Sequence, residues 1–189
     1  MKYNNIFILG AAILSGCAST YSPVLDGKPT ARIRLASSFP ENTWVSALKE
    51  ECFDRVESAA TMAYLASPVV TPRRESLGIP AEKFSPNTAF QERVIPAGVP
   101  INIAFFAEGI YGAVLAGVTA GGTASGGVAT DLFCTTAVKF TPVANNDYEM
   151  LFELSENKCT LSVVQVRVDS NQSVIRQPVS DTKRLPHCS

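Results

Sequence analysis

The chain has 189 residues, with 16 Lys and Arg against 17 Asp and Glu and a formal net charge of −1. This near-neutral balance, without a basic run, argues against a nucleic acid partner. The sequence also lacks a phosphate-binding glycine pattern that ends in Lys-Ser or Lys-Thr. The length suits a single domain that can bury a core of its own.

The amino terminus has the layout of a secretory leader. Lys2 supplies a positive start, and Ile6 to Leu14 form an apolar run too short to span a bilayer as a mature helix. The next residues complete Leu14-Ser15-Gly16-Cys17, which resembles the lipobox of bacterial lipoproteins. The resemblance implies cleavage before Cys17, a diacylglycerol on its sulfur and acylation of the new amino terminus. We therefore expect residues 1–16 to be a helical signal peptide and Cys17 to be the lipid attachment site.

The residues after the lipobox suggest a cellular location and a tether. In enterobacterial-type sorting, an aspartate after the lipidated cysteine would keep the protein from reaching the outer membrane. Ala18 occupies this position, so the rule favours the outer membrane, with the domain facing the periplasm. Each buried methylene contributes about 0.8 kcal/mol, so three acyl chains anchor stably. Ser19 to Pro29 has no helix or strand period, and residues 17–29 are predicted to be a lipidated flexible tether. An ordinary secretory leader or a short transmembrane helix is the alternative.

Residues 30–189 are expected to form one domain that begins with strands. Thr30 to Ser38 alternates between apolar residues on one face and Arg32 and Arg34 on the other, which predicts a half-buried strand. The stretch from Thr43 to Ser58 fits a helical stripe, but Thr43 to Leu48 also fits a strand. We favour the strand because the surrounding sequence has β character.

Short strands with turn signals between them continue to the carboxyl terminus. A loop is predicted over Ser67–Asn87, which contains four prolines, and turns are predicted over Pro96–Pro100, Thr141–Asn146 and Ser155–Lys158. This spacing predicts an all-β fold, an antiparallel β-sandwich of the Ig-like or transthyretin-like kind. The further predicted strands are Ala59–Ala66, Phe90–Ile95, Ile101–Ala107, Leu132–Thr141, Asp147–Ser155, Cys159–Val168 and an edge strand over Gln172–Val179.

Four cysteines besides Cys17 predict two disulfides in an exported domain, and none lies in a C-x-x-C pair that would suggest a zinc or thioredoxin-like site. In a three-stranded meander, Cys134 and Cys159 would flank the middle strand, roughly 9 to 10 Å apart. A disulfide requires Cα atoms within about 7 Å. We therefore predict the pairs Cys159–Cys188 and Cys52–Cys134.

The segment from Gly109 to Thr130 contains no charged residue. Its length and its small-residue spacings, such as Gly117-x-x-x-Gly121, would suit a membrane span, but its many glycines disfavour a helix. A long loop between two strands is the preferred interpretation. Long apolar loops are often functional, and the expected interaction residues are Gly109, Tyr111, Leu115, Gly121 and Gly126.

Residue types that carry chemistry are sparse in this sequence. His187 is the only histidine, and no nucleophile and acid accompany it in a triad pattern. Glu50, Glu51 and Asp54 fit a solvated charged surface, and Trp44 fits a core position. We therefore expect no catalytic residue, no metal site, no cofactor and no enzymatic activity.

Several segments together resemble small uncharacterised envelope lipoproteins of Gram-negative bacteria. The resemblance extends from Leu77-Gly78-Ile79-Pro80 and Pro96-Ala97-Gly98-Val99-Pro100 to the block from Cys134 to Cys159, which contains Asp147-Tyr148-Glu149. It implies structural motifs rather than an activity, with Tyr148 in a core or corner role. We expect a membrane-anchored periplasmic lipoprotein with a structural or interaction role and an envelope protein as partner. A small-ligand or peptidoglycan-binding module is the alternative.

Overall fold

The computed structural model describes residues 21–23, 25, 27–38, 43–53, 59–66, 74–81, 88–111, 130–155 and 158–188. Within these ranges the chain forms strands and no helix, which confirms the all-β prediction. The expected signal helix and Cys17 lie outside the described residues. The strands are β1 (Thr30–Ser37), β2 (Thr43–Leu48), β3 (Ala59–Ala66), β4 (Arg74–Glu75), β5 (Ala89–Pro96), β6 (Ile101–Tyr111), β7 (Thr130–Phe140), β8 (Asp147–Ser155), β9 (Lys158–Val168), β10 (Val174–Pro178) and β11 (Lys183–Arg184).

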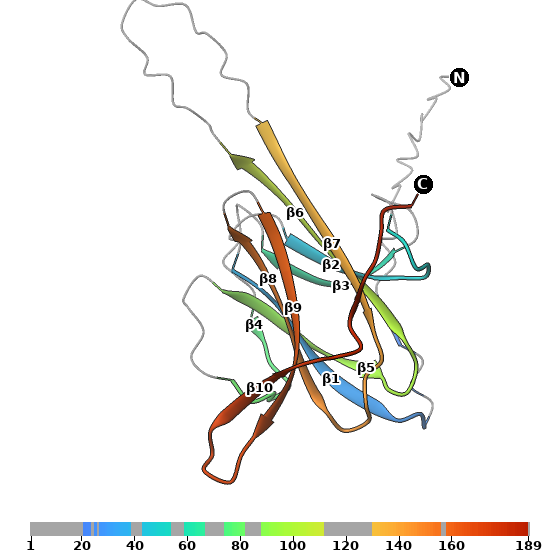
Figure 1. Cartoon of the computed structure of the whole chain (residues 1–189), viewed down its shortest axis with the longest axis vertical. Coiled ribbons are helices and arrows are strands. Elements are labelled where there is room, and N and C mark those ends of the chain that lie inside the picture. Colours follow the sequence, from blue (N-terminus) through green and yellow to red (C-terminus); the bar gives the residue numbers. More distant parts are fainter. Residues whose placement is uncertain are drawn as a thin grey trace, which may run out of the picture.

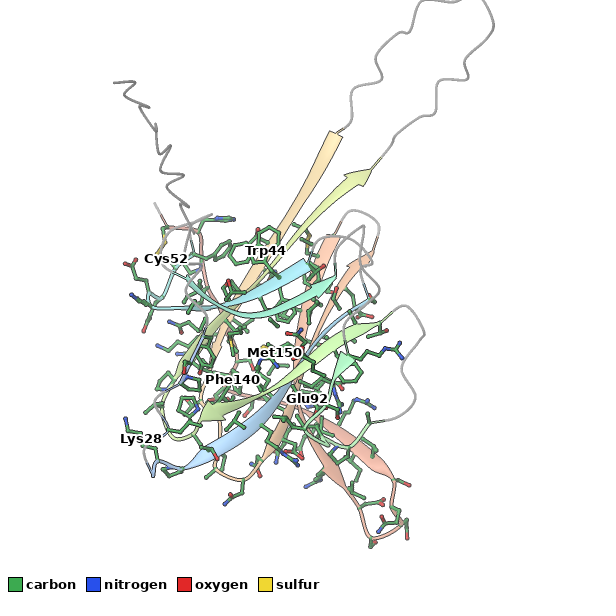
Figure 2. All side chains as sticks on the ribbon, turned by 180° about the vertical axis from the view of Figure 1, so that it is seen from behind. Lys28, Trp44, Cys52, Glu92, Phe140 and Met150 are labelled. Atoms are coloured by element: carbon green, nitrogen blue, oxygen red, sulfur yellow. A yellow bond between two sulfur atoms is a disulfide. The ribbon has the colours of Figure 1, made fainter. Side chains whose placement is uncertain are left out.

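The strands form two sheets that pack face to face (Figure 1). The six-stranded sheet has the order β10-β9-β8-β1-β5-β4, and the five-stranded sheet has the order β11-β7-β6-β2-β3. Apolar side chains from both sheets fill the space between them, and the rings of Phe105 and Phe152 stack across it with centroids 5.6 Å apart. Met150 lies within this core (Figure 2). The predicted sandwich is therefore confirmed.

Local patterning accounts for the first two strands. Ile33 and Leu35 of β1 are fully buried between the sheets, as the alternation of that segment predicts. The ambiguous stretch after Thr43 forms strand β2, which ends at Leu48. This strand pairs with β3 on one side and with β6 on the other, so neighbouring strands satisfy its backbone.

Two strand pairs are parallel in an otherwise antiparallel architecture. β1 pairs in parallel with β8, and the two-residue strand β4 pairs in parallel with β5. The chain between β1 and β8 passes through the other sheet, so no tight hairpin requires the two strands to run in opposite directions. The six-stranded sheet is therefore mixed, whereas the sequence suggested antiparallel pairing throughout.

The cysteine pairing differs from the prediction because β7 and β8 lie in different sheets. Cys134 on β7 faces Cys159 on β9 across the sandwich, with a Cα–Cα distance of 6.2 Å, and the two form a disulfide. Cys52 and Cys188 form the other, with a Cα–Cα distance of 5.0 Å. The predicted pairs Cys159–Cys188 and Cys52–Cys134 are wrong, because that geometry assumed a meander within one sheet.

The second disulfide holds the carboxyl-terminal segment against the outer face of the five-stranded sheet. Phe53 N–H donates to the Pro186 carbonyl at 3.0 Å, and Leu185 N–H donates to the Ala137 carbonyl at 2.9 Å. This segment covers a second apolar cluster, so the sheet buries side chains on both faces. The cluster consists of Leu48, Phe53, Ala104, Phe106, Ala137 and Leu185, with Trp44 packed against it.

Two turns meet at the end of the sandwich where β6 and β8 begin. Gly98 in the predicted turn over Pro96–Pro100 has φ +77°, a conformation that favours glycine. Gly98 N–H donates to the Pro142 carbonyl at 2.8 Å, which ties this turn to the one over Thr141–Asn146. The described part of the predicted loop over Ser67–Asn87 contains β4 and the segment 76–81.

Candidate interaction site

The hairpin of β6 and β7 extends beyond the body of the sandwich (Figure 1). The two strands pair along their full lengths, from Ile101 opposite Phe140 to Tyr111 opposite Thr130. β2 accompanies β6 only as far as Ala107. The remaining paired residues, 108–111 and 130–133, therefore form a two-stranded extension, which we call the β6–β7 ribbon.

The ribbon contains part of the predicted interaction loop. Gly109 pairs with Leu132 and Tyr111 pairs with Thr130, so these two predicted site residues belong to strands. The predicted strand ended at Ala107, which is where support from β2 ends. The other predicted site residues, Leu115, Gly121 and Gly126, lie outside the described residues.

The ribbon differs from the rest of the sheet in its backbone. Each of its strands has the other as its neighbour, and no further described strand pairs with its outer edges. Unpaired N–H and C=O groups at a strand edge are a template on which another chain can add a strand. The ribbon is thus a place where a partner can bind through main-chain hydrogen bonds.

The segment before β1 contacts the domain earlier than the tether prediction implied. Tyr21 N–H donates to the Thr61 carbonyl of β3 at 2.9 Å, and its side chain packs against the core between the sheets. Burial raises the pKa of its phenol above the ordinary value. Pro29 accepts a hydrogen bond from Ala97 N–H at 2.9 Å. The predicted tether therefore becomes part of the packed domain at Tyr21.

A buried charged cluster lies on the outer side of the six-stranded sheet. Its centre is Arg34 of β1, whose register partners are Glu92 on β5 and Glu149 on β8. The Arg34 Nη2 lies 2.6 Å from Glu92 Oε1, and its Nη1 lies 2.9 Å from Glu149 Oε2. Arg176 of β10 donates from Nε to Glu149 Oε1 at 2.9 Å. The cluster contains two cations and two carboxylates, so its formal charges balance.

Residues 76–80 cover this cluster. Arg34 donates to the carbonyls of Ile79 and Pro80, and Arg32 donates to the carbonyl of Leu77 at 3.0 Å. These contacts leave Arg34 only 1% exposed. Arg34 lies on the face of β1 opposite Ile33 and Leu35, as the sequence predicts, but this face is not exposed at Arg34 because residues 76–80 fold over it.

The second carboxylate oxygen of Glu92 accepts hydrogen bonds from the covering segment. Ser76 Oγ donates at 3.1 Å and Ile79 N–H donates at 3.2 Å, and Leu77 N–H also donates to it. Burial raises the pKa of Glu92, but these backbone donors and Arg34 outweigh it, so the pKa lies below the ordinary value. The carboxylates of the cluster are engaged by hydrogen-bond donors. We therefore interpret the cluster as a buried clamp, a charged network that fastens residues 76–80 to the sheet, rather than an acid–base site.

Sequence reasoning missed this cluster, although a signal was available. Arg34 lies in a segment whose apolar residues are buried, and Glu92 and Glu149 each lie in a predicted strand. Opposite charges directly across neighbouring strands stabilise a sheet. Knowledge of the strand order would have brought the three residues together, but periodicity alone does not reveal which strands are neighbours.

The remaining polar candidates have structural roles. The His187 ring lies 4.0 Å from the Phe53 ring, and Glu51 forms an ion pair with Lys139. Asp54 lies outside the described residues. Tyr148 is buried in the core and its hydroxyl accepts a hydrogen bond from Val143 N–H at 2.9 Å, in line with the predicted core or corner role.

One group of potential metal ligands contains two cysteines that form a disulfide. Glu50, Cys52 and Cys188 have their ligand atoms within 4.8 Å of one another. The two sulfurs are joined in a disulfide and offer no thiolate to a metal ion. We therefore assign no metal to this group.

Comparisons with protein-family models, with curated proteins and with solved structures gave no significant match to this chain. In the ranges that the structure describes, the chain contains no helix with the length and apolar character needed to cross a membrane.

Proposed function

We propose that this chain is a lipid-anchored, periplasm-facing protein of the outer membrane with a structural or protein-interaction role in the cell envelope. The proposed location and anchoring rest on Leu14-Ser15-Gly16-Cys17 at the end of the leader. The observation that carries the interaction role is the β6–β7 ribbon, which extends past the last residue supported by β2. The partner is a second envelope protein.

The disulfides support an exported location. The two bridges together use Cys52, Cys134, Cys159 and Cys188, and one of them joins the two sheets. Disulfides persist in oxidising compartments such as the bacterial periplasm and are rare in the cytosol. A domain that relies on both bridges suits the compartment that the lipobox implies.

The ribbon suits protein recognition better than catalysis. It presents strand edges away from the sandwich and leads into sequence without charge between Gly109 and Thr130. Main-chain donors and acceptors at a strand edge are typical of strand-addition interfaces.

Site-specific crosslinking in intact cells tests the interaction role. A photo-crosslinking residue replaces Tyr111 in the ribbon, and the matched control replaces Val168, an exposed apolar residue of β9. We expect a discrete crosslinked envelope protein from position 111 and none of the same mass from position 168. Identical adducts from both positions, or adducts with lipid alone, would contradict a specific protein partner.

The anchoring claim has its own test. Cys17→Ala removes the sulfur that would carry the lipid, so we expect the variant to lose labelling by radioactive palmitate and, once its leader is cleaved, to leave the membrane fraction. The matched control is Cys52→Ala together with Cys188→Ala, which removes a disulfide but leaves Cys17 in place. Retention of Cys17→Ala in washed membranes after its leader has been cleaved would contradict the lipid anchor.

A further inference from the structure

The distance along the chain between the proposed anchor and the folded domain is short. Tyr21 follows Cys17 by four residues and is the first residue with a described contact to the sandwich. Four residues span at most about 14 Å, at roughly 3.3 to 3.6 Å for each residue. A lipid on Cys17 would therefore be tied to the domain by a very short connection, not by the thirteen-residue tether suggested by residues 17–29.

The connection reaches one particular edge of the fold. Tyr21 hydrogen-bonds to Thr61 in β3, and β3 is an edge strand of the five-stranded sheet. The tyrosine side chain packs on the core, so the contact is supported by apolar burial as well as by one hydrogen bond. The domain is thus held at a defined strand and not at the end of a free linker.

We infer that the β3 edge of the sandwich rests against the headgroup surface of the bilayer that holds the Cys17 lipid. This inference rests on the proposed anchoring of the chain, and it adds an orientation that the anchor alone does not imply. The partner that the β3 edge contacts is the phospholipid headgroup layer itself. The short connection confines β3 to the neighbourhood of that layer.

The composition of the edge is compatible with this contact. β3 consists of Ala-Ala-Thr-Met-Ala-Tyr-Leu-Ala and has no charged residue. An uncharged strand can approach the interface without removing a charge from water, which would be costly. Arg93 of β5 lies beside this edge, where its Nε donates to the Met62 carbonyl at 2.9 Å. Its Nη1 pairs with Glu75 Oε2 at 2.9 Å, so this ion pair brings no net charge to the edge.

The chain contains a natural reporter of this geometry. Trp44 is the single tryptophan, and it lies on β2 opposite Tyr64 of β3. Neighbouring strands are about 4.8 Å apart, so Trp44 stands one strand away from the proposed membrane-facing edge. Figure 2 shows Trp44 on the side of Met150 opposite to Glu92. Energy transfer from Trp44 to a dansyl group on lipid headgroups therefore reports how close the β3 side lies to the bilayer.

The experiment uses the lipidated protein purified from cells and reconstituted into phosphatidylethanolamine–phosphatidylglycerol vesicles that contain dansyl-phosphatidylethanolamine. The test variant carries about twenty Gly and Ser residues inserted after Ala18, which adds an average span of about 25 Å. The control carries the same insertion between Asn171 and Gln172, in the turn between β9 and β10. We expect the natural protein and the control to show the same strong transfer. The extended-tether variant should show about half of that transfer or less.

The outcomes separate this inference from the anchoring proposal. If the natural protein binds vesicles no better than Cys17→Ala, the anchor and the orientation are both wrong. If the natural protein is vesicle-bound through Cys17 but its transfer is weak, or equals that of the extended-tether variant, the anchor stands and the β3 orientation is overturned. A second variant, Tyr21→Pro, removes the N–H that donates to Thr61. This variant should also lower the transfer, whereas Ser22→Pro should preserve it.

Discussion

Replacing Arg34 with Met should destabilise the protein strongly, because it removes the cation at the centre of the buried cluster. The Arg34 side chain is 2% exposed, and its partners Glu92 and Glu149 are 0% and 5% exposed. Breaking a buried ion pair by removing one partner costs about 3 to 5 kcal/mol. Met retains much of the apolar volume, so the loss arises mainly from the two carboxylates left behind.

The remaining contacts place the expected loss at the lower end of that range. Glu149 keeps its ion pair with Arg176 at 2.9 Å, and Glu92 keeps donors from Ser76 and from the backbone of the covering segment. We therefore expect the free energy of unfolding to fall by about 3 kcal/mol. Small domains are stable by about 5 to 15 kcal/mol, so the variant should still fold.

The matched control is Arg32→Met, two residues away on the same face of β1. Arg32 pairs with Asp147 through two hydrogen bonds of 2.7 Å, but its side chain is 40% exposed. An exposed ion pair contributes about 0 to 1 kcal/mol. Urea unfolding followed by Trp44 fluorescence measures both variants. Equal losses for Arg32→Met and Arg34→Met would refute the assignment of a buried clamp.

A double-mutant cycle tests whether Glu92 is the partner that matters. If Arg34 and Glu92 stabilise each other, then Arg34→Met with Glu92→Gln should cost less than the sum of the single losses, by about 0.5 to 3 kcal/mol. Strict additivity would show that the ion pair seen at 2.6 Å does not couple the two residues.

Three further predictions concern acid, the disulfides and the tyrosine corner. The folded-state pKa of Glu92 lies below its ordinary 4.5, so its contribution is present above that pH and is lost as the pH falls through the folded value. Acid unfolding of Glu92→Gln should therefore depend less on pH below 4.5 than that of the natural protein, and identical profiles would contradict this. Peptide mapping should yield Cys134–Cys159 and Cys52–Cys188, whose sequence separations are 25 and 136. By loop entropy, replacing these pairs with alanine should cost about 3.5 and about 5 kcal/mol, respectively, in thermal or urea unfolding, and the reverse order would refute the entropic account. Tyr148→Phe removes the acceptor for Val143 N–H at 2.9 Å and should cost about 1 kcal/mol in urea. An unchanged midpoint would show that water replaces the hydroxyl.

The strands were largely predictable because strand periodicity is a local property of the chain. The predicted bounds of the segments over Ala59–Ala66 and Asp147–Ser155 match β3 and β8. The edge position of β10 also followed from its sequence context. The β6–β7 hairpin was recognised as two strands around an uncharged segment, but its strands run further than the apolar pattern indicated. Hydrogen bonding between the two strands continues the ladder after the support of β2 ends.

The cysteine pairing shows where local reasoning stops. The rule that two strand spacings are too far for a disulfide is correct within one sheet. Cys134 and Cys159 satisfy the distance requirement because their strands belong to opposite sheets. Turn lengths between β7, β8 and β9 do not distinguish a meander from a chain that crosses to the other sheet. The prediction failed at the choice of sheet and not at the choice of strand.

By itself, the sequence determined the β class, most strand positions and the presence of disulfides, because alternation and turn chemistry act between near neighbours in the chain. The tertiary structure alone decided which strands adjoin, and with that it decided the pairing of Cys134, the burial of Arg34 and the contact of Tyr21 with β3. Each of these joins residues that are distant in sequence. Their energies depend on closure of the whole sandwich, which no local pattern encodes.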